Sequence, residues 1–167
     1  MNIIKDIVIG EIAGKNAAIH AYDKILWTIR TGYLTLFYSG WAIVLNGIIN
    51  NGGEIKSYSE VIIVMLAITF GLTAGAYIVD KNYIRRKFRV IHALNSILET
   101  LVKSDLVNDI NTDALSVLNE HMRVSGDADN ERYKTDGYRQ AVRAENAIFS
   151  ISAISLLAAL AYIYMPL

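Results

Sequence analysis

The sequence contains no cysteine among its 167 residues. This absence excludes thiol catalysis, cysteine-based zinc sites and disulfide bonds. Charged residues are also scarce, at 19% against roughly 25% in an average soluble domain. The formal net charge at pH 7 is zero, so overall charge gives no support for binding to nucleic acid. Asp6, Glu11 and Lys15 interrupt the N-terminal region, and we therefore expect no cleavable signal peptide.

Apolar residues make up 53% of the chain and are concentrated in three uncharged runs. The runs cover residues 31–50, 61–79 and 146–167. A helix of about 20 residues crosses the roughly 30 Å hydrocarbon core of a bilayer, whereas helices in soluble cores seldom have such long uninterrupted apolar runs. The pattern predicts an all-α membrane protein with a two-span hairpin at 31–79 and a third span at the C-terminus.

Lysine and arginine predict the orientation of these spans. The connection 51–60 carries one base and two acids. Segment 80–145 is basic next to both of its flanking spans, through Lys81, Arg85, Arg86, Lys87, Arg89, Arg139 and Arg143. Short segments rich in these residues stay in the cytoplasm. We therefore expect an inner-membrane protein with the N-terminus and residues 80–145 in the cytoplasm and the C-terminus outside.

The remaining segments carry helical patterns. Residues 1–30 form an amphipathic lead, which lies along the inner membrane surface or packs on the cytoplasmic helices. Span two is expected to continue unbroken to about Lys103, because no proline or glycine interrupts the apolar stripe that follows it. A turn near Asn111 precedes a shorter helix, and after a loop at Ser125–Asn130 a final helix leads into span three.

Small and polar residues inside the spans suggest assembly. Gly71 and Gly75 form a GxxxG motif, which lets two helix backbones approach closely, and Gly40 extends the small-residue theme. The motif serves either contacts between subunits or packing inside one chain. Thr35 and Asn46 are polar residues in span one that either line a conduit in an oligomer or form hydrogen bonds to a neighbouring helix.

Basic residues at the membrane boundary suggest contacts with lipid. Arg30 stands at the start of span one, where its side chain is expected to extend to the headgroups, with a pore-lining or gating role as the alternative. Arg85, Arg86, Lys87 and Arg89 either bind anionic headgroups or act only as determinants of topology.

Two sequence patterns resemble functional sites, but each lacks a residue that such a site requires. Arg86 and His92 have the spacing found in RNA-cleaving HEPN domains. Those active sites also place a polar residue beside the arginine, whereas here Lys87 and then apolar residues fill the interval. Asp127, Asp129 and Glu131 suggest a calcium loop, but its sixth position is Arg132 where glycine is required. We expect no catalytic, metal or cofactor site, and do not expect an enzyme.

The segment Tyr22–Thr35, with sequence YDKILWTIRTGYLT, leads from the amphipathic segment into the hairpin, and a long charged helical segment follows. This order resembles the SLATT-type membrane proteins of prokaryotic conflict systems. It is similar, more distantly, to small octameric membrane proteins that include accessory proteins of RNA-targeting CRISPR systems. The C-terminal span departs from a simple SLATT arrangement. The resemblance implies a homo-oligomeric effector that permeabilises the inner membrane, and it carries over no functional residues.

The sequence thus leaves two functional hypotheses. One is a pore-forming or membrane-perturbing effector of a defence system, whose partners are the lipid bilayer and further copies of itself. The other is a membrane-anchored scaffold or regulator that binds a cytoplasmic protein through residues 80–145. Nucleic acid is not expected as a partner.

Overall fold

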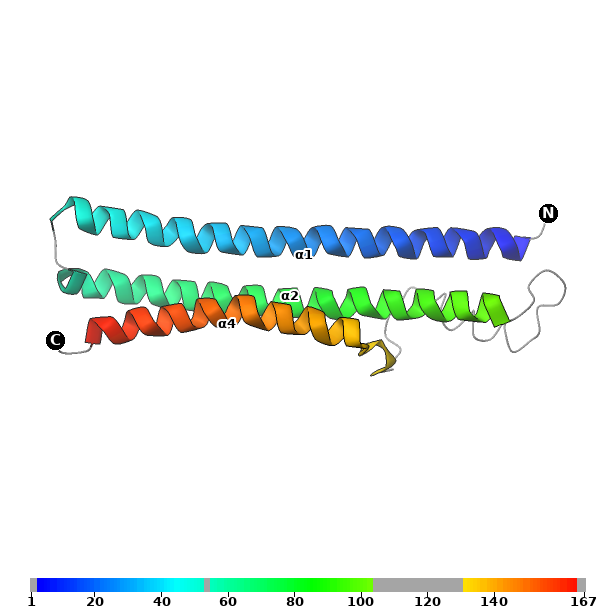
Figure 1. The fold of residues 1–167 in the computed structure, drawn as a ribbon. Helices are drawn as coiled ribbons and strands as arrows, with labels where there is room; N and C mark the ends of the chain where they lie inside the picture. The colour runs from blue at the N-terminus through cyan, green and yellow to red at the C-terminus, as the bar shows by residue number, and fades with distance from the viewer. Residues whose placement is uncertain (1–2, 53–54, 104–130, 165–167) are drawn as a thin grey trace. The chain divides into compact units, whose positions relative to one another are not determined.

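The computed structural model describes residues 3–52, 55–103 and 131–164. Figure 1 shows their elements, and within these ranges all of them are helices, which confirms the all-α fold. In chain order they are α1 (Ile3–Asn50), the 3-10 helix η1 (Ile55–Tyr58), α2 (Ser59–Lys103), the 3-10 helix η2 (Glu131–Tyr133) and α4 (Asp136–Tyr164). Each of α1, α2 and α4 contains a stretch that is long and apolar enough to cross a membrane.

Helix α1 includes both the amphipathic lead and span one without a break. Gly10 and Gly14, which weaken the helical pattern of the lead, lie inside it. The helix ends at a local cap. The backbone N–H and the side-chain amide of Asn51 both donate to the carbonyl of Gly47, and Gly52 has a φ of 61°. This left-handed conformation is unstrained only in glycine, so the residue after Asn51 permits the chain to turn.

Helix α2 confirms the expected continuation of span two, because it runs from Ser59 to Lys103. Helix α4 differs from expectation at its start, which is Asp136 and not a residue near Asn130. The reason is a cap: the hydroxyl of Thr135 accepts a hydrogen bond from the backbone N–H of Tyr138 at 3.4 Å. A threonine in this position satisfies one of the free N–H groups of the first helical turn. The expected turn near Asn111 and the loop at Ser125–Asn130 lie outside the described residues.

The chain divides into two compact units. We call residues 26–82 and 141–167 the span unit, and residues 1–25 and 83–140 the charged unit. In the charged unit, the amphipathic lead packs on the later part of α2: buried Val8 contacts buried Ile97, and Ile12 and Leu101 pack beside them. Of the two places predicted for the lead, the structure thus shows packing on another helix.

The core of the span unit combines residues from all three long helices. Its buried members are Tyr33, Phe37, Ile48, Ile62, Leu66, Phe149 and Leu156. Two hydroxyls of this unit form a hydrogen bond between α1 and α2. The hydroxyls of Tyr33 and Thr73 lie 3.0 Å apart, and Thr73 itself donates to the carbonyl of Thr69. Since the only hydroxyl hydrogen of Thr73 is used in that bond, Tyr33 is the donor between the two helices.

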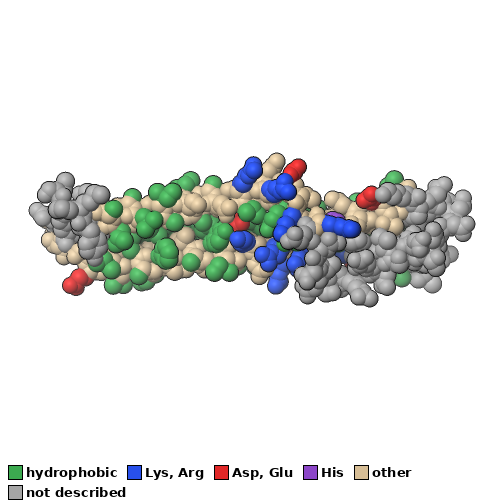
Figure 2. Space-filling model, turned by 90° about the horizontal axis from the view of Figure 1, so that it is seen from below, with side chains coloured by type: hydrophobic (Ala, Val, Ile, Leu, Met, Phe, Trp, Pro, Cys, Tyr) green, Lys and Arg blue, Asp and Glu red, His purple; other side chains and the backbone are tan. Residues whose placement is uncertain are grey.

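The surface of the span unit is largely apolar. On the face drawn in Figure 2, hydrophobic side chains are spread along the helices of this unit. Large exposed hydrophobic residues occur on each helix, among them Leu36, Ile43, Ile68, Ile78, Ile154 and Leu157. Soluble monomers rarely expose apolar patches of this extent, which more often mark contact with a membrane or another protein. The surface is therefore compatible with a location in a membrane.

Candidate functional site

Three charged residues stand directly at the boundaries of the three apolar runs. Arg30 precedes residues 31–50, Asp80 follows residues 61–79, and Glu145 precedes residues 146–167. In each helix the charged residue continues the buried stripe of the span. Glu145, for example, is followed by buried Phe149 four residues later, which is about one helical turn. The charges therefore point into the span unit and not outward.

Arg30 and Asp80 form an ion pair across α1 and α2. The Arg30 Nη2 lies 2.9 Å from Asp80 Oδ2, and Nε lies 3.2 Å from Oδ1 and 3.1 Å from Oδ2. The side chain of Asp80 is fully buried and that of Arg30 is 25% exposed. A guanidinium that meets both carboxylate oxygens forms strong, geometrically specific hydrogen bonds. The Arg30 guanidinium is thus engaged by a carboxylate of its own chain, and the expected contact of Arg30 with headgroups stays a prediction.

Glu145 lies in the same region but has no such partner in the described part of the chain. Its side chain is fully buried, and among the described residues neither carboxylate oxygen accepts a hydrogen bond. Its charged neighbours are Asp80, Lys81 and Arg30. Burying an ionisable group without a partner is costly, and such groups in membrane proteins are often functional. A hydrogen-bond donor placed next to the Glu145 carboxylate would therefore stabilise that group.

A chain of polar contacts extends from this charge cluster to the surface of α4. Lys81 Nζ donates to the Tyr77 hydroxyl at 3.3 Å, and that hydroxyl donates to Asn146 Oδ1, also at 3.3 Å. Lys81 also lies 5.3 Å from the centre of the Tyr77 ring, within the range of a cation–π contact. The amide of Asn146 and the ammonium of Lys81 are thus both fixed by the same tyrosine.

The polar residues of span one form an exposed stripe on α1. Thr35, Ser39, Asn46 and Asn50 are all exposed. Thr35 follows buried Tyr33 by two residues, Ser39 follows Phe37 by two and Asn50 follows Ile48 by two. A two-residue step turns an α-helix by about 200°. The polar stripe therefore lies on the side of α1 opposite to its packed face.

Hydrogen bonds inside the stripe use only part of the hydrogen-bonding capacity of its side chains. Ser39 donates to the carbonyl of Thr35 at 2.6 Å, as hydroxyls in membrane helices commonly do. The Asn50 amide donates to the side-chain oxygen of Asn46 at 3.2 Å. Each of these two amides offers two N–H donors and an oxygen with two lone pairs, so a single bond between them leaves capacity for further partners.

The three glycines proposed for packing have different surroundings. At Gly71 and Gly75, a Cβ atom added to the backbone would meet no described atom within 4 Å, so this face of α2 is open. At Gly40 a Cβ would lie 3.8 Å from Met65 Cε, which is ordinary contact between α1 and α2. Gly40 therefore packs within the chain, whereas a side chain added at either glycine of the GxxxG motif would enter open space in the described part of the protomer.

The basic run of the charged unit is divided between paired and exposed residues. Lys87 forms an ion pair with Asp23, and the Arg89 guanidinium lies 5.4 Å from the centre of the Tyr133 ring. Arg85 and Arg86 are exposed. Of the four bases proposed for lipid headgroups, two are thus held by protein contacts and two are open to an outside partner.

Sequence reasoning missed the cluster of Arg30, Asp80 and Glu145 as a group. The sequence does show that each of these charged residues flanks an apolar run and continues its helical stripe. That position does not reveal which of the charged side chains contact one another. Across residues 3–52, 55–103 and 131–164, no group of three or more histidine, aspartate or glutamate side chains is placed to hold a metal ion.

Comparison with protein-family models, curated proteins and solved structures finds no match for this chain.

Proposed function

We propose that this chain is a homo-oligomeric protein of the prokaryotic inner membrane that forms a pore or otherwise perturbs the bilayer, as an effector of a defence system. The observation that carries the proposal is the exposed polar stripe of α1, with Thr35, Ser39, Asn46 and Asn50 on the side opposite to the core. The defence role follows from the resemblance to SLATT-type proteins.

The stripe is unfavourable if it faces lipid. A polar group without a hydrogen-bond partner in hydrocarbon raises the free energy by roughly several kcal/mol. The Asn46 and Asn50 amides use only part of their hydrogen-bonding capacity within the chain. A neighbouring subunit or a water-filled lumen supplies the missing partners. Because the four residues cover about four helical turns, a lumen lined by them would extend through most of span one.

The open face at Gly71 and Gly75 supports assembly. Helices associate in membranes through close backbone contact, and small residues permit that contact. At both glycines an added Cβ would meet no described atom within 4 Å, so the protomer leaves room there for a second helix. In the proposed oligomer this face of α2 contacts an adjacent subunit, and the polar stripes of α1 face a common axis. The distribution of lysine and arginine supports a cytoplasmic location for the N-terminus and residues 80–145.

Conductance of the purified protein in planar bilayers tests the proposal. We expect a detergent-stable oligomer that conducts ions, and a large loss of conductance when Ser39→Val and Asn46→Leu are combined. Ser155→Val is the matched control, because Ser155 on α4 is also exposed and donates to the carbonyl four residues earlier. A protein that stays monomeric and does not conduct contradicts the proposal, as does equal conductance in the stripe variant and the wild type.

A scaffold or regulator is the second candidate, favoured by the exposed Arg85 and Arg86 of the charged unit. Here the spans act as an anchor and these bases bind an acidic surface of a cytoplasmic protein. Affinity purification from cells of the wild type and of Arg85→Gln/Arg86→Gln distinguishes the candidates. A stoichiometric partner lost in the variant, together with absence of conductance, favours the scaffold.

A further inference from the structure

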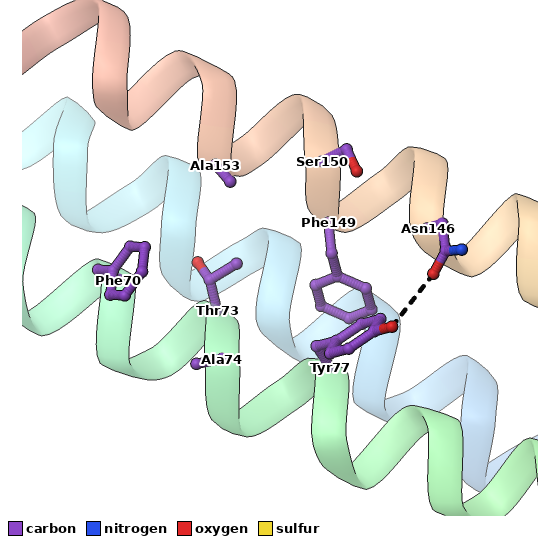
Figure 3. Close-up of a pocket in the computed structure, with 8 residues that line it drawn as sticks. All are labelled: Phe70, Thr73, Ala74, Tyr77, Asn146, Phe149, Ser150 and Ala153. Atoms are coloured by element: carbon purple, nitrogen blue, oxygen red, sulfur yellow. Dashed lines mark hydrogen bonds between the residues drawn. The ribbon is translucent and has the colours of Figure 1, made fainter.

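A groove lies between α2 and α4 on the surface of the span unit. Figure 3 shows Phe70, Thr73 and Tyr77 of α2 on one wall and Phe149 and Ala153 of α4 on the other. The cavity has a volume of about 460 Å³. All the residues that line this cavity belong to α2 or α4, so α1 forms neither of the two walls.

A second cavity of about 280 Å³ continues the groove towards the C-terminal end of α4. The two cavities share Phe70, and the second is lined entirely by apolar side chains, from Ile63 on α2 to Leu160 on α4. From Ile63 to Tyr77 the helix rises about 21 Å at 1.5 Å per residue. One leaflet of the hydrocarbon core is about 15 Å thick, which is half of the bilayer value. The groove is thus long enough to hold an acyl chain along the depth of one leaflet.

The two ends of the groove differ in chemistry. The end at Tyr77 carries the Asn146 amide, and Lys81 Nζ lies 3.3 Å from the Tyr77 hydroxyl. Arg30 is engaged by Asp80, whereas Lys81 is a charged neighbour of Glu145 but forms no salt bridge within the described residues. Lys81 and Asn146 also stand at the boundary of their apolar runs, where headgroups are expected. A cation and an amide donor at this depth are complementary to a phosphate.

We propose that this groove binds an anionic phospholipid of the cytoplasmic leaflet, with one acyl chain against Phe70 and Ala153 and the phosphate at Lys81 and Asn146. A helix of a second subunit is the less suitable occupant. Its diameter of about 10 Å with side chains lets it rest over such a groove, while an acyl chain enters it. The proposal needs the three helices to span a bilayer, but it does not depend on a pore.

Native mass spectrometry of the full chain, titrated with phosphatidylglycerol or phosphatidylcholine, tests the site. Ala153→Phe fills the groove, and we expect it to weaken phosphatidylglycerol binding by about tenfold or more. Ala158→Phe is the matched control, because this exposed alanine of α4 lines neither cavity and its substitution should change binding less than about twofold. Lys81→Gln should abolish the preference for phosphatidylglycerol over phosphatidylcholine and leave weak binding of both.

A second variant tests the site if Ala153→Phe fails to fold. Ala74→Leu narrows the groove from its α2 wall with a smaller side chain, and circular dichroism checks the helix content of every variant. Unchanged phosphatidylglycerol binding in both folded groove variants overturns the proposal. So does an oligomer that dissociates in Ala153→Phe while lipid binding persists, because a second subunit is then the occupant. A monomeric, non-conducting protein that selects phosphatidylglycerol contradicts the pore but supports the lipid site.

Discussion

Arg30 and Asp80 are fifty residues apart in the sequence, yet the Arg30 guanidinium bonds to both carboxylate oxygens of Asp80. Each residue marks the end of an apolar run, so the ion pair ties α1 to α2 at matching ends of their spans. Because Asp80 is fully buried, we expect the pair to favour one registry of the two helices.

Loss of Arg30 should destabilise the protein strongly. Arg30→Gln leaves the carboxylate of Asp80 buried without its partner, which costs about 3–5 kcal/mol in comparable pairs. Unfolding in detergent, followed by circular dichroism, measures the difference. The double variant Arg30→Gln/Asp80→Asn should recover most of the loss, and Arg85→Gln, at an exposed base, should have little effect. A double variant no more stable than Arg30→Gln alone would show that the ion pair is not the cause.

Replacing Glu145 with glutamine should stabilise the span unit. The substitution keeps the shape of the side chain and removes an ionisable group that accepts no hydrogen bond from the described residues. We expect a gain of roughly 1 kcal/mol in the free energy of unfolding, because unpaired buried charged groups cost more than neutral ones. Glu60→Gln, at an exposed glutamate near the start of α2, is the control. A clear loss of stability in Glu145→Gln would reveal a needed contact of the carboxylate.

The hydrogen bond between Tyr33 and Thr73 should make a small but measurable contribution. Tyr33→Phe removes only the donor hydroxyl, and interhelical bonds of this kind in a membrane protein average about 0.6 kcal/mol. Tyr38→Phe provides the comparison, because Tyr38 lies on the same helix and is 64% exposed. The unfolding free energy should fall in the first variant and stay constant in the second. Equal values for both would contradict the assigned bond.

The GxxxG motif should affect assembly more than folding. In Gly71→Leu/Gly75→Leu the new side chains meet no described atom of the same chain, so the helix content and unfolding temperature should stay close to the wild type. Size-exclusion chromatography with light scattering should show a shift from oligomer to smaller species. Gly40→Leu is the contrasting variant, because its side chain meets Met65 and should lower the stability of the protomer itself. An unchanged oligomer in the double variant would exclude this face from the interface.

The long helices could be predicted because their signals are local. The apolar runs at 31–50 and 61–79, and the uninterrupted stripe that continues to Lys103, depend on residues close together in the chain. The start of α4 was missed by several residues, because Thr135 provides the cap and its role depends on the backbone conformation around it. Gly71 and Gly75 were recognised as a motif, but the sequence could not show that their face is open within the protomer.

The sequence by itself thus determined three apolar helices, their approximate limits and the charges at their ends. Only the tertiary structure decided that Arg30 pairs with Asp80, and that Tyr77 and Asn146 meet at one end of a groove. It also decided that Glu145 is buried beside the ion pair with no hydrogen-bond partner among the described residues. The physical reason is that helical periodicity identifies a buried face within each helix. Which residues meet across two faces depends on the rotation and axial offset of the helices, and these are set by packing of side chains distant in the sequence.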